Sequence, residues 1–178
     1  ARTNTYAPLD VLKSKYEEVL KIDNVIGLSI ATRCDAISDD TLDYLEELNK
    51  RTYLTIELGL QTIHDDTSKL INRGHTLKEF DDMVKKLRDR NIEVVVHIIN
   101  GLPCETEDMM LDTIKHLNKL DIQGIKIHML NIVKDTPLET LYNKEHFHIL
   151  TKEEYIDIVI KQLELLKPEI VIHRITSD

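Results

Sequence analysis

The residues whose types and spacing could do chemistry begin in the segment Tyr53–Thr62, which alternates aliphatic and polar side chains. Successive side chains of a β-strand point to opposite faces, so this alternation predicts one apolar face and one polar face. The polar face carries Glu57, Gly59 and Gln61. Burying a carboxylate and an amide is unfavourable unless they are paired or bind a ligand. The pattern therefore favours a ligand-lined interior, and an edge strand whose polar face meets water is the alternative.

Glu57 and Gln61 are the first candidate site residues, because they lie on either side of Gly59 on one strand face. Gly59 has no side chain and could let a flat ligand approach the backbone. The carboxylate of Glu57 could contact that ligand, or it could pair with a basic residue and hold the sheet together. Gln61 lies where the strand ends, and there we expect a ligand contact.

Two further polar residues, Arg73 and His97, lie beyond that strand. Arg73 follows a short helix that is predicted to reach about residue 72, and its guanidinium could bind a carboxylate. The alternative role for Arg73 is to cap the carbonyl groups at that helix end. His97 is the one strongly polar group near the middle of its strand, and both a core role and a functional role stay open for it.

Residues that commonly bind metals are too scattered to predict a metal site in this chain. Cys104 has no second cysteine nearby, and His146 and His148 fall in a predicted loop without a partner carboxylate at helical spacing. Solvated loop histidines explain that pair more simply. The sequence also contains neither a P-loop nor a Gly-x-Gly-x-x-Gly turn.

Five strands are predicted to alternate with helices. Hydrophobic patterning places the strands near residues 25–31, 53–60, 92–99, 123–130 and 169–175. Ser38, Thr76 and Thr151 are predicted to cap helices between them. Residues 131–150 are expected to form a long loop, and residues 1–6 the end of a strand with its exit loop.

This alternation predicts an α/β fold with a parallel sheet and right-handed crossovers. Strands of a doubly wound sheet are aliphatic on both faces, whereas most strands here are aliphatic on one face only. A partial TIM-like (βα) barrel fits better, with helices outside and the site at the C-terminal strand ends. The chain starts in what reads as the middle of an element, so we expect one barrel domain over residues 1–178, truncated at the N-terminus.

Composition is that of a globular protein, with 178 residues of which 42% are hydrophobic. The formal net charge of -9 disfavours broad, non-specific nucleic-acid binding. The two cysteines, Cys34 and Cys104, lie far apart and favour a reducing compartment over a disulfide framework. The sequence shows neither a signal peptide nor an apolar run of membrane-spanning length, so a cytoplasmic location is expected.

Three motifs, in their order and spacing, resemble those of radical S-adenosylmethionine proteins. They are residues 57–62 (ELGLQT), 71–75 (INRGH) and 100–106 (NGLPCET). The chain is similar to the branch of the elongator catalytic subunit and oxygen-independent coproporphyrinogen oxidase, and within it to bacterial proteins described as Fe–S oxidoreductases. The resemblance extends over essentially the whole chain, from Thr3 to Thr176. It implies a partial barrel of six βα units.

The resemblance implies two cofactors, a four-iron four-sulfur cluster and S-adenosylmethionine. The cluster would sit on a Cys-x3-Cys-x2-Cys loop after the first strand, and its open iron would chelate the methionine amine and carboxylate. Reductive cleavage would give a 5′-deoxyadenosyl radical that abstracts hydrogen, so the parent is expected to be an oxidoreductase or transferase. The motifs do not identify its substrate, for which RNA and protein are both open.

By the same resemblance, Gln61 and Arg73 match positions that contact S-adenosylmethionine in relatives. His97 stands where relatives have an aspartate that faces the ribose. Ala31 stands where they have a glutamate, so Ser29 or Arg33 could substitute for it.

Thr3 falls at the strand end that meets the methionine amine in relatives, next to Arg2 where a glycine is usual. Thr3, Arg33, Glu57 and His97 are therefore weaker cofactor-binding candidates than the Gln61 and Arg73 pair.

The chain departs from the family pattern because it contains no Cys-x3-Cys-x2-Cys sequence. The cluster ligands would lie before Ala1, and this chain alone is expected to be inactive. Loss of the first βα unit would also expose an unpaired strand edge, through which the chain could self-associate.

Two other functions remain open. One is a barrel enzyme that uses a divalent metal or acid/base chemistry through Glu57, His97, Lys126 and His128. The other is a non-catalytic barrel domain that binds RNA or a protein, which should carry exposed aromatic residues or a basic patch.

Overall fold

Five parallel strands form one sheet in the order β1-β2-β3-β4-β5 in the computed structural model, which describes residues 4–176. The strands are β1 Gly27–Thr32, β2 Tyr53–Gln61, β3 Glu93–Asn100, β4 Gly124–Met129 and β5 Val171–Arg174. The α-helices are α1 Leu9–Leu20, α2 Asp39–Asn49, α3 Asp65–Leu70, α4 Leu77–Arg88, α5 Glu107–Leu117, α6 Pro137–Glu145 and α7 Lys152–Leu165. Two 3-10 helices, Asn4–Tyr6 and Cys34–Ala36, complete the described elements. All five strands were predicted within a few residues of their observed bounds.

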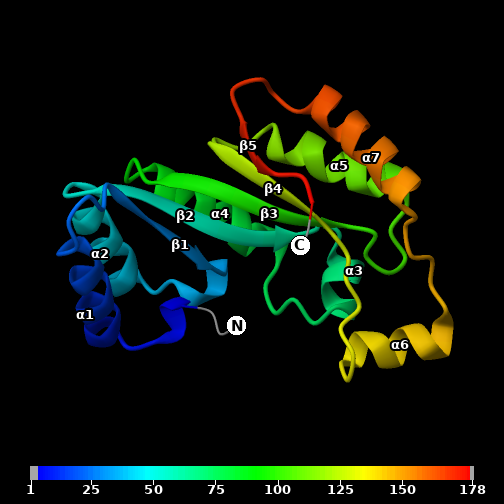
Figure 1. Cartoon of the computed structure of the whole chain (residues 1–178), viewed down its shortest axis with the longest axis horizontal. Coiled ribbons are helices and arrows are strands. Elements are labelled where there is room, and N and C mark those ends of the chain that lie inside the picture. The colour runs from blue at the N-terminus through cyan, green and yellow to red at the C-terminus, as the bar shows by residue number, and fades with distance from the viewer. Residues whose placement is uncertain (1–3, 177–178) are drawn as a thin grey trace.

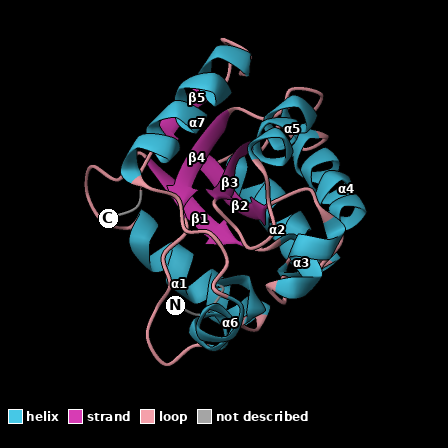
Figure 2. Cartoon of the chain, turned by 90° about the vertical axis from the view of Figure 1, so that its right-hand side faces the viewer, coloured by secondary structure: helices cyan, strands magenta, loops and turns pink. Residues whose placement is uncertain are grey.

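One face of the sheet packs against the helices and forms the core. Figure 2 shows α2, α4 and α5 on the same side of the strands. Their apolar side chains meet the alternate aliphatic residues of each strand, which are fully buried on β2 at Leu54, Ile56, Leu58 and Leu60. The other side of the sheet, called the inner face here, is the one seen in Figure 1 with α4 behind the strands. The prediction of a partial barrel with helices outside is confirmed.

Adjacent strands keep a parallel register that brings the polar residues of different strands side by side. Gly59 of β2 pairs with His97 of β3, and His97 pairs with Lys126 of β4. The register between β2 and β3 shifts between Gly59 and Gln61, where Gln61 takes a positive φ of 72°. This irregularity turns the end of β2 at the edge where the site is expected.

The helix starts follow the predicted capping chemistry. The hydroxyls of Ser38, Thr76 and Thr151 accept hydrogen bonds from backbone N–H groups of the first turns of α2, α4 and α7. Thr76 and Thr151 form complete capping boxes with Glu79 and Glu154. These contacts satisfy N–H groups that lack partners inside the helix.

The prediction of one long loop over residues 131–150 is wrong, because α6 lies within it. Thr136 caps this helix and Pro137 occupies its first position, which suits proline because no N–H is needed there. None of its residues is buried, so the apolar periodicity that reveals other helices is missing. Figure 1 shows α6 projecting beside the C-terminal ends of the strands.

Smaller details concern the ends of two other elements. Asn4–Tyr6 forms a 3-10 helix where an exit loop was expected, while residues 1–3 lie outside the described part. The hydroxyl of Thr5 nonetheless reaches that of Thr32 at the end of β1. Helix α5 ends at Leu117, and Asn118 follows it as the C-cap.

Truncation of a core residue on β2 should destabilise the fold strongly. Ile56 is 0% exposed, so Ile56→Ala removes buried methyl groups and leaves a cavity, for an expected loss of about 2–5 kcal/mol in the free energy of unfolding. The matched control is Ile26→Ala, because Ile26 is 88% exposed and its loss should change stability by no more than about 0.5 kcal/mol. Urea unfolding monitored by circular dichroism measures both, and equal effects would contradict this core assignment.

Candidate functional site

The guanidinium of Arg73 lies against the backbone of β2 at Gly59. Its Nη2 donates a hydrogen bond to the carbonyl oxygen of Gly59. A Cβ atom at position 59 would lie 2.7 Å from Nη2 of Arg73 and 2.9 Å from Nε2 of Gln61, closer than real Cβ contacts allow. The expectation that Gly59 opens space for a flat ligand is therefore wrong: the arginine fills that space. The alternative role for Arg73 was to cap the carbonyl groups at the end of the preceding helix. Its side-chain hydrogen bond instead goes to a carbonyl of the strand β2.

Polar atoms of Gln61 and Arg73 are buried without partners among residues 4–176. They are Oε1 of Gln61 and Nε of Arg73. Burial lowers the pKa of Arg73, and the nearby Arg33 cation adds to this effect. Unpaired buried donors and acceptors cost free energy, so both atoms are suited to a ligand that brings the missing partners.

Arg33 lies on the other side of the same loop. A Cβ at Gly74, where φ is 83°, would lie 2.6 Å from Nη2 of Arg33, so glycine is needed for the backbone conformation and for space. Arg33 itself is paired with Asp35 through two hydrogen bonds of 2.8 and 2.7 Å. A cavity of about 380 Å³ opens beside Arg73 and is lined by α3 and the start of α4.

Glu57 is the centre of a hydrogen-bonded cluster on the inner face. Its Oε1 accepts hydrogen bonds from Ser29 Oγ at 2.8 Å and from Lys126 Nζ at 2.7 Å. Its Oε2 lies 3.0 Å from Nε2 of His97, whose ring centroid is 5.3 Å from that of His128. The side chains of Glu57 and Lys126 are 16% and 18% exposed. Of the two roles left open for Glu57, the structure shows the ion pair.

These contacts set the protonation states of the cluster. Burial alone would raise the pKa of Glu57, but hydrogen bonds from Lys126 and Ser29 and the Lys126 charge lower it to about 2. Burial lowers the pKa of His97 to about 4, and Lys126 adds to this shift while Glu57 opposes it. Near neutral pH, Glu57 is therefore an anion and His97 is neutral.

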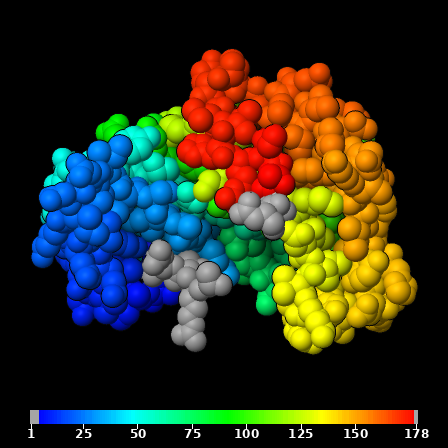
Figure 3. Space-filling model, in the orientation of Figure 1, coloured from blue at the N-terminus to red at the C-terminus, as the bar shows by residue number. Residues whose placement is uncertain are grey.

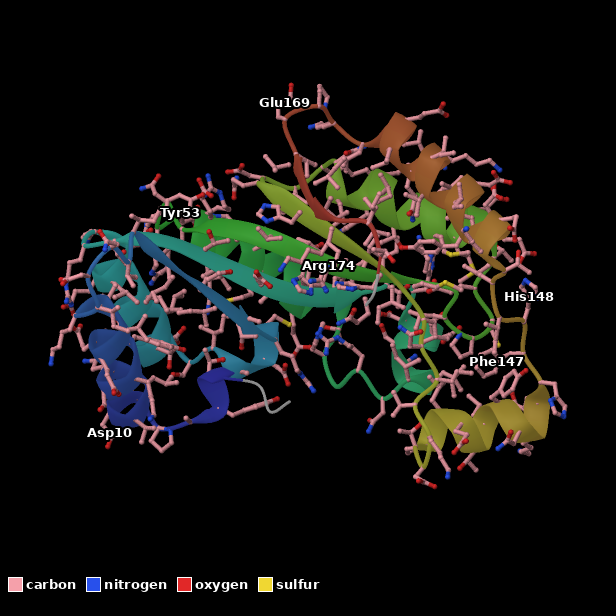
Figure 4. All side chains as sticks on the ribbon, viewed as in Figure 1. Asp10, Tyr53, Phe147, His148, Glu169 and Arg174 are labelled. Atoms are coloured by element: carbon pink, nitrogen blue, oxygen red, sulfur yellow. The ribbon has the colours of Figure 1, made fainter. Side chains whose placement is uncertain are left out.

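The predicted site residues thus form two neighbouring groups, and one of them cannot be placed. Gln61, Arg73 and Arg33 gather at the C-terminal strand ends, and Glu57 and His97 lie one or two pleats deeper. Thr3 lies outside the described residues. Figure 4 shows Arg174 of β5 over the middle of the inner face, with Phe147 and His148 far from it between α6 and α7. The sequence patterns did not indicate Asp35, which holds Arg33.

The metal-dependent alternative finds no support in the described part of the chain. Within residues 4–176, no group of three or more His, Cys, Asp and Glu side chains is placed to hold a metal ion. Cys34 is buried and Cys104 is exposed, and both are free thiols. No helix among those residues is long and apolar enough to cross a membrane.

Replacing the central carboxylate should expose its structural contribution. Glu57→Gln leaves the partly buried Lys126 without its counter-ion. We expect a loss of about 2–4 kcal/mol in the free energy of unfolding at neutral pH, which is slightly less than for a fully buried ion pair. In the wild-type protein, folding lowers the pKa of Glu57 from 4.5 to about 2. The stabilisation that ionised Glu57 provides is therefore fully present above pH 4.5 and is lost as the pH falls towards about 2. The difference between the two proteins should shrink over that range.

The control for this experiment is Glu107→Gln, which removes a surface pair with Lys161. Exposed pairs contribute about 0–1 kcal/mol, so its effect should be small at every pH. Denaturant unfolding from acid to neutral pH tests the prediction, and a Glu57→Gln protein as stable as wild type would argue against it.

Comparison with known protein families matches two adjoining regions. The Radical SAM superfamily matches residues 3–117, and the Radical SAM C-terminal domain matches residues 122–178. The first match includes β1–β3 with Glu57, Gln61, Arg73 and His97. The second includes Lys126 on β4 and the strand β5.

Individual relatives agree with these matches. The uncharacterized protein YtqA of Bacillus subtilis is 52% identical over 178 residues, which are 100% of this chain and 55% of that protein. Elongator complex protein 3 of Schizosaccharomyces pombe is 26% identical over 86% of this chain and 28% of its own length. The chain thus spans about half the length, or less, of these curated relatives.

A solved structure shows the same fold. Elp3 from the archaeon Methanocaldococcus infernus superposes with a TM-score of 0.78 at 24% identity, over 86% of this chain and 36% of that one. The family match over residues 3–117 covers more than half of the sequence, and the resemblance predicted from the motifs is confirmed. The protein belongs to the radical S-adenosylmethionine superfamily, and it is similar to Elongator complex protein 3.

Proposed function

We propose that this chain is the core of a radical S-adenosylmethionine enzyme, an oxidoreductase or transferase that acts by hydrogen abstraction. In the complete enzyme, bound S-adenosylmethionine and a four-iron four-sulfur cluster would supply the radical chemistry for this hydrogen abstraction. The contribution of this chain is to bind and orient S-adenosylmethionine at the C-terminal ends of β1–β3 and to limit access of water. Membership of the superfamily supports this activity for the longer parent protein.

The observation that carries the proposal is the pair of unpartnered polar atoms beside Gly59. Oε1 of Gln61 and Nε of Arg73 are buried and lack hydrogen-bond partners among residues 4–176. S-adenosylmethionine offers a carboxylate, an amine, ribose hydroxyls and the adenine edge, which include both acceptors and donors. Arg73 is suited to an acceptor and Gln61 Oε1 to a donor, so the residues present fit this molecule.

The hydrogen bond from Arg73 to Gly59 helps to explain how the site is prepared. One N–H group of the guanidinium is already held by the strand backbone, so the side chain loses little further freedom when a ligand binds. Arg33 and Arg73 also lie close enough for Arg33 to lower the pKa of Arg73. We assign Arg33 to the wall of the site, because its Nε and Nη2 donors are engaged by Asp35.

The residues of this chain do not fit the cluster itself. A four-iron four-sulfur cluster needs several thiolates gathered at one place. Cys34 is buried after β1, while Cys104 is exposed after β3. We therefore propose that the cluster ligands belong to the parent protein outside these 178 residues.

Reconstitution of this chain tests the assignment of the cluster ligands. After anaerobic incubation with iron and sulfide, followed by desalting, the chain should retain no stable cluster and should not cleave S-adenosylmethionine. Visible absorbance, iron content and chromatography of the products measure this outcome. Stoichiometric assembly of a cluster on the wild-type chain would overturn the assignment. Failure of Cys34→Ser or Cys104→Ser to assemble that cluster would show that the cysteine is a ligand.

Substitution of Arg73 and Gln61 in the cluster-loaded parent tests the cofactor site. A neutral hydrogen bond contributes about 0.5–1.5 kcal/mol and a charged one about 1.5–3 kcal/mol. Gln61→Ala should therefore weaken S-adenosylmethionine binding several-fold, and Arg73→Ala about tenfold or somewhat more. Isothermal titration calorimetry gives both affinities, and circular dichroism checks that the fold is retained.

The matched control is Arg51→Ala. Arg51 forms an exposed ion pair with Glu17 at 2.6 Å, on a surface away from the site, so its loss should leave cofactor affinity unchanged. If both site variants bind S-adenosylmethionine as tightly as wild type and the control, Gln61 and Arg73 have structural roles and the proposed site is wrong.

A further inference from the structure

His97 lies between the proposed cofactor site and the Glu57 cluster. Its register partner on β2 is Gly59, whose carbonyl oxygen accepts a hydrogen bond from Arg73. Its register partner on β4 is Lys126, which is bound to Glu57. His97 is therefore next to both groups in the strand register.

The contact with Glu57 fixes which nitrogen of His97 carries a proton. Glu57 is ionised at neutral pH and can only accept hydrogen bonds, so Nε2 of His97, at 3.0 Å, must be the donor. In a neutral imidazole the other nitrogen is then an acceptor. Nδ1 lies on the side of the ring away from Glu57, so it presents a lone pair away from the carboxylate.

Lys126 adds to burial in keeping the ring neutral. A carboxylate beside a histidine normally favours the protonated imidazolium. Here Lys126 Nζ lies 2.7 Å from the same carboxylate and offsets its charge. Glu57 from β2 and His128 from β4 also lie near the ring, and Arg174 of β5 is the register partner of Lys126. Ser29 of β1 adds an uncharged donor to Glu57.

We propose that Lys126, acting through Glu57, is a positioning residue that keeps His97 as the neutral Nε2–H tautomer, with Nδ1 available to accept a hydrogen bond from a hydroxyl or amine of the ligand bound at Gln61 and Arg73. Glu57 is then a support for His97 and does not itself bind the cofactor. The ligand part of this inference rests on the proposed function, whereas the tautomer and the role of Lys126 do not.

This arrangement makes the site selective for hydrogen-bond donors. A neutral Nδ1 accepts from a hydroxyl or an ammonium group, but a protonated ring would repel the ammonium group and could not accept from either. The pKa of His97 is lowered to about 4, so its acceptor is retained throughout the neutral range in the wild-type protein. Without Lys126, the remaining Glu57 charge should raise the pKa of His97 and allow protonation at higher pH.

Nitrogen-15 NMR of the histidine-labelled chain tests the tautomer without any cofactor. At neutral pH, the two ring nitrogens of His97 should show the shifts of a neutral Nε2–H tautomer, and titration should begin only well below the ordinary pKa of about 6.5. In Lys126→Met, which keeps much of the side-chain volume, the pKa should move upward. Lys126→Arg should restore the wild-type behaviour.

The matched control is Lys115→Met, because Lys115 pairs with Asp112 on the surface of α5. This change should leave the His97 resonances where they are, and circular dichroism shows whether each variant is folded. A protonated ring, an Nδ1–H tautomer at neutral pH, or an unchanged pKa in folded Lys126→Met would overturn the inference.

Cofactor affinity in the cluster-loaded parent tests the role of Nδ1. Wild type should bind S-adenosylmethionine with little change between about pH 5.5 and 7.5, whereas Lys126→Met should bind about three- to tenfold more weakly at the lower value as His97 becomes protonated. A flat profile in Lys126→Met, together with an intact Arg73→Ala effect, would overturn this inference alone. Loss of the Arg73 effect would instead overturn the proposed function.

Discussion

The ion pair between Glu57 and Lys126 is the constraint on which the inner face depends. Glu57 contacts Ser29 of β1, His97 of β3 and Lys126 of β4, so one carboxylate on β2 connects four parallel strands. The opposite face of the sheet is held by aliphatic packing, which is not directional. The inner face has little such packing at this level, so directional hydrogen bonds fix the relative positions of the strands there.

A polar support of this kind leaves room for a site at the strand ends. The cluster pairs Glu57 with Ser29, His97 and Lys126 deeper in the sheet, while Oε1 of Gln61 and Nε of Arg73 lack partners among residues 4–176. Glycines at positions 59 and 74 let the guanidiniums of Arg73 and Arg33 approach the backbone closely. The site therefore lies above the hydrogen-bonded Glu57 cluster and contains two arginines. Arg33 is paired with Asp35, whereas Arg73 is held by the carbonyl of Gly59 and has no carboxylate bonded to it among residues 4–176.

The elements around the site differ in how far their residues are buried. Helices α4 and α5 pack tightly on the sheet, but α6 has no buried residue and lies beside the strand ends. Figure 3 shows the C-terminal strand segment in red in front of the middle of the molecule, between the N-terminal part in blue and the α6 region in yellow. All residues of β5 are exposed, so this edge of the partial barrel is the least enclosed.

The sequence alone determined the positions of the strands, their aliphatic face and the motifs that place the chain in its superfamily. These follow from local alternation and residue type, as in Leu54 to Leu60, and need no knowledge of partners. The tertiary structure decided what each polar residue of the inner face contacts. Glu57 and Lys126 are 69 positions apart, and only strand register brings them together. Similarly, the space beside Gly59 is filled by Arg73 because the chain returns there after α3, and α6 escaped prediction because a helix without a buried face leaves no periodic pattern.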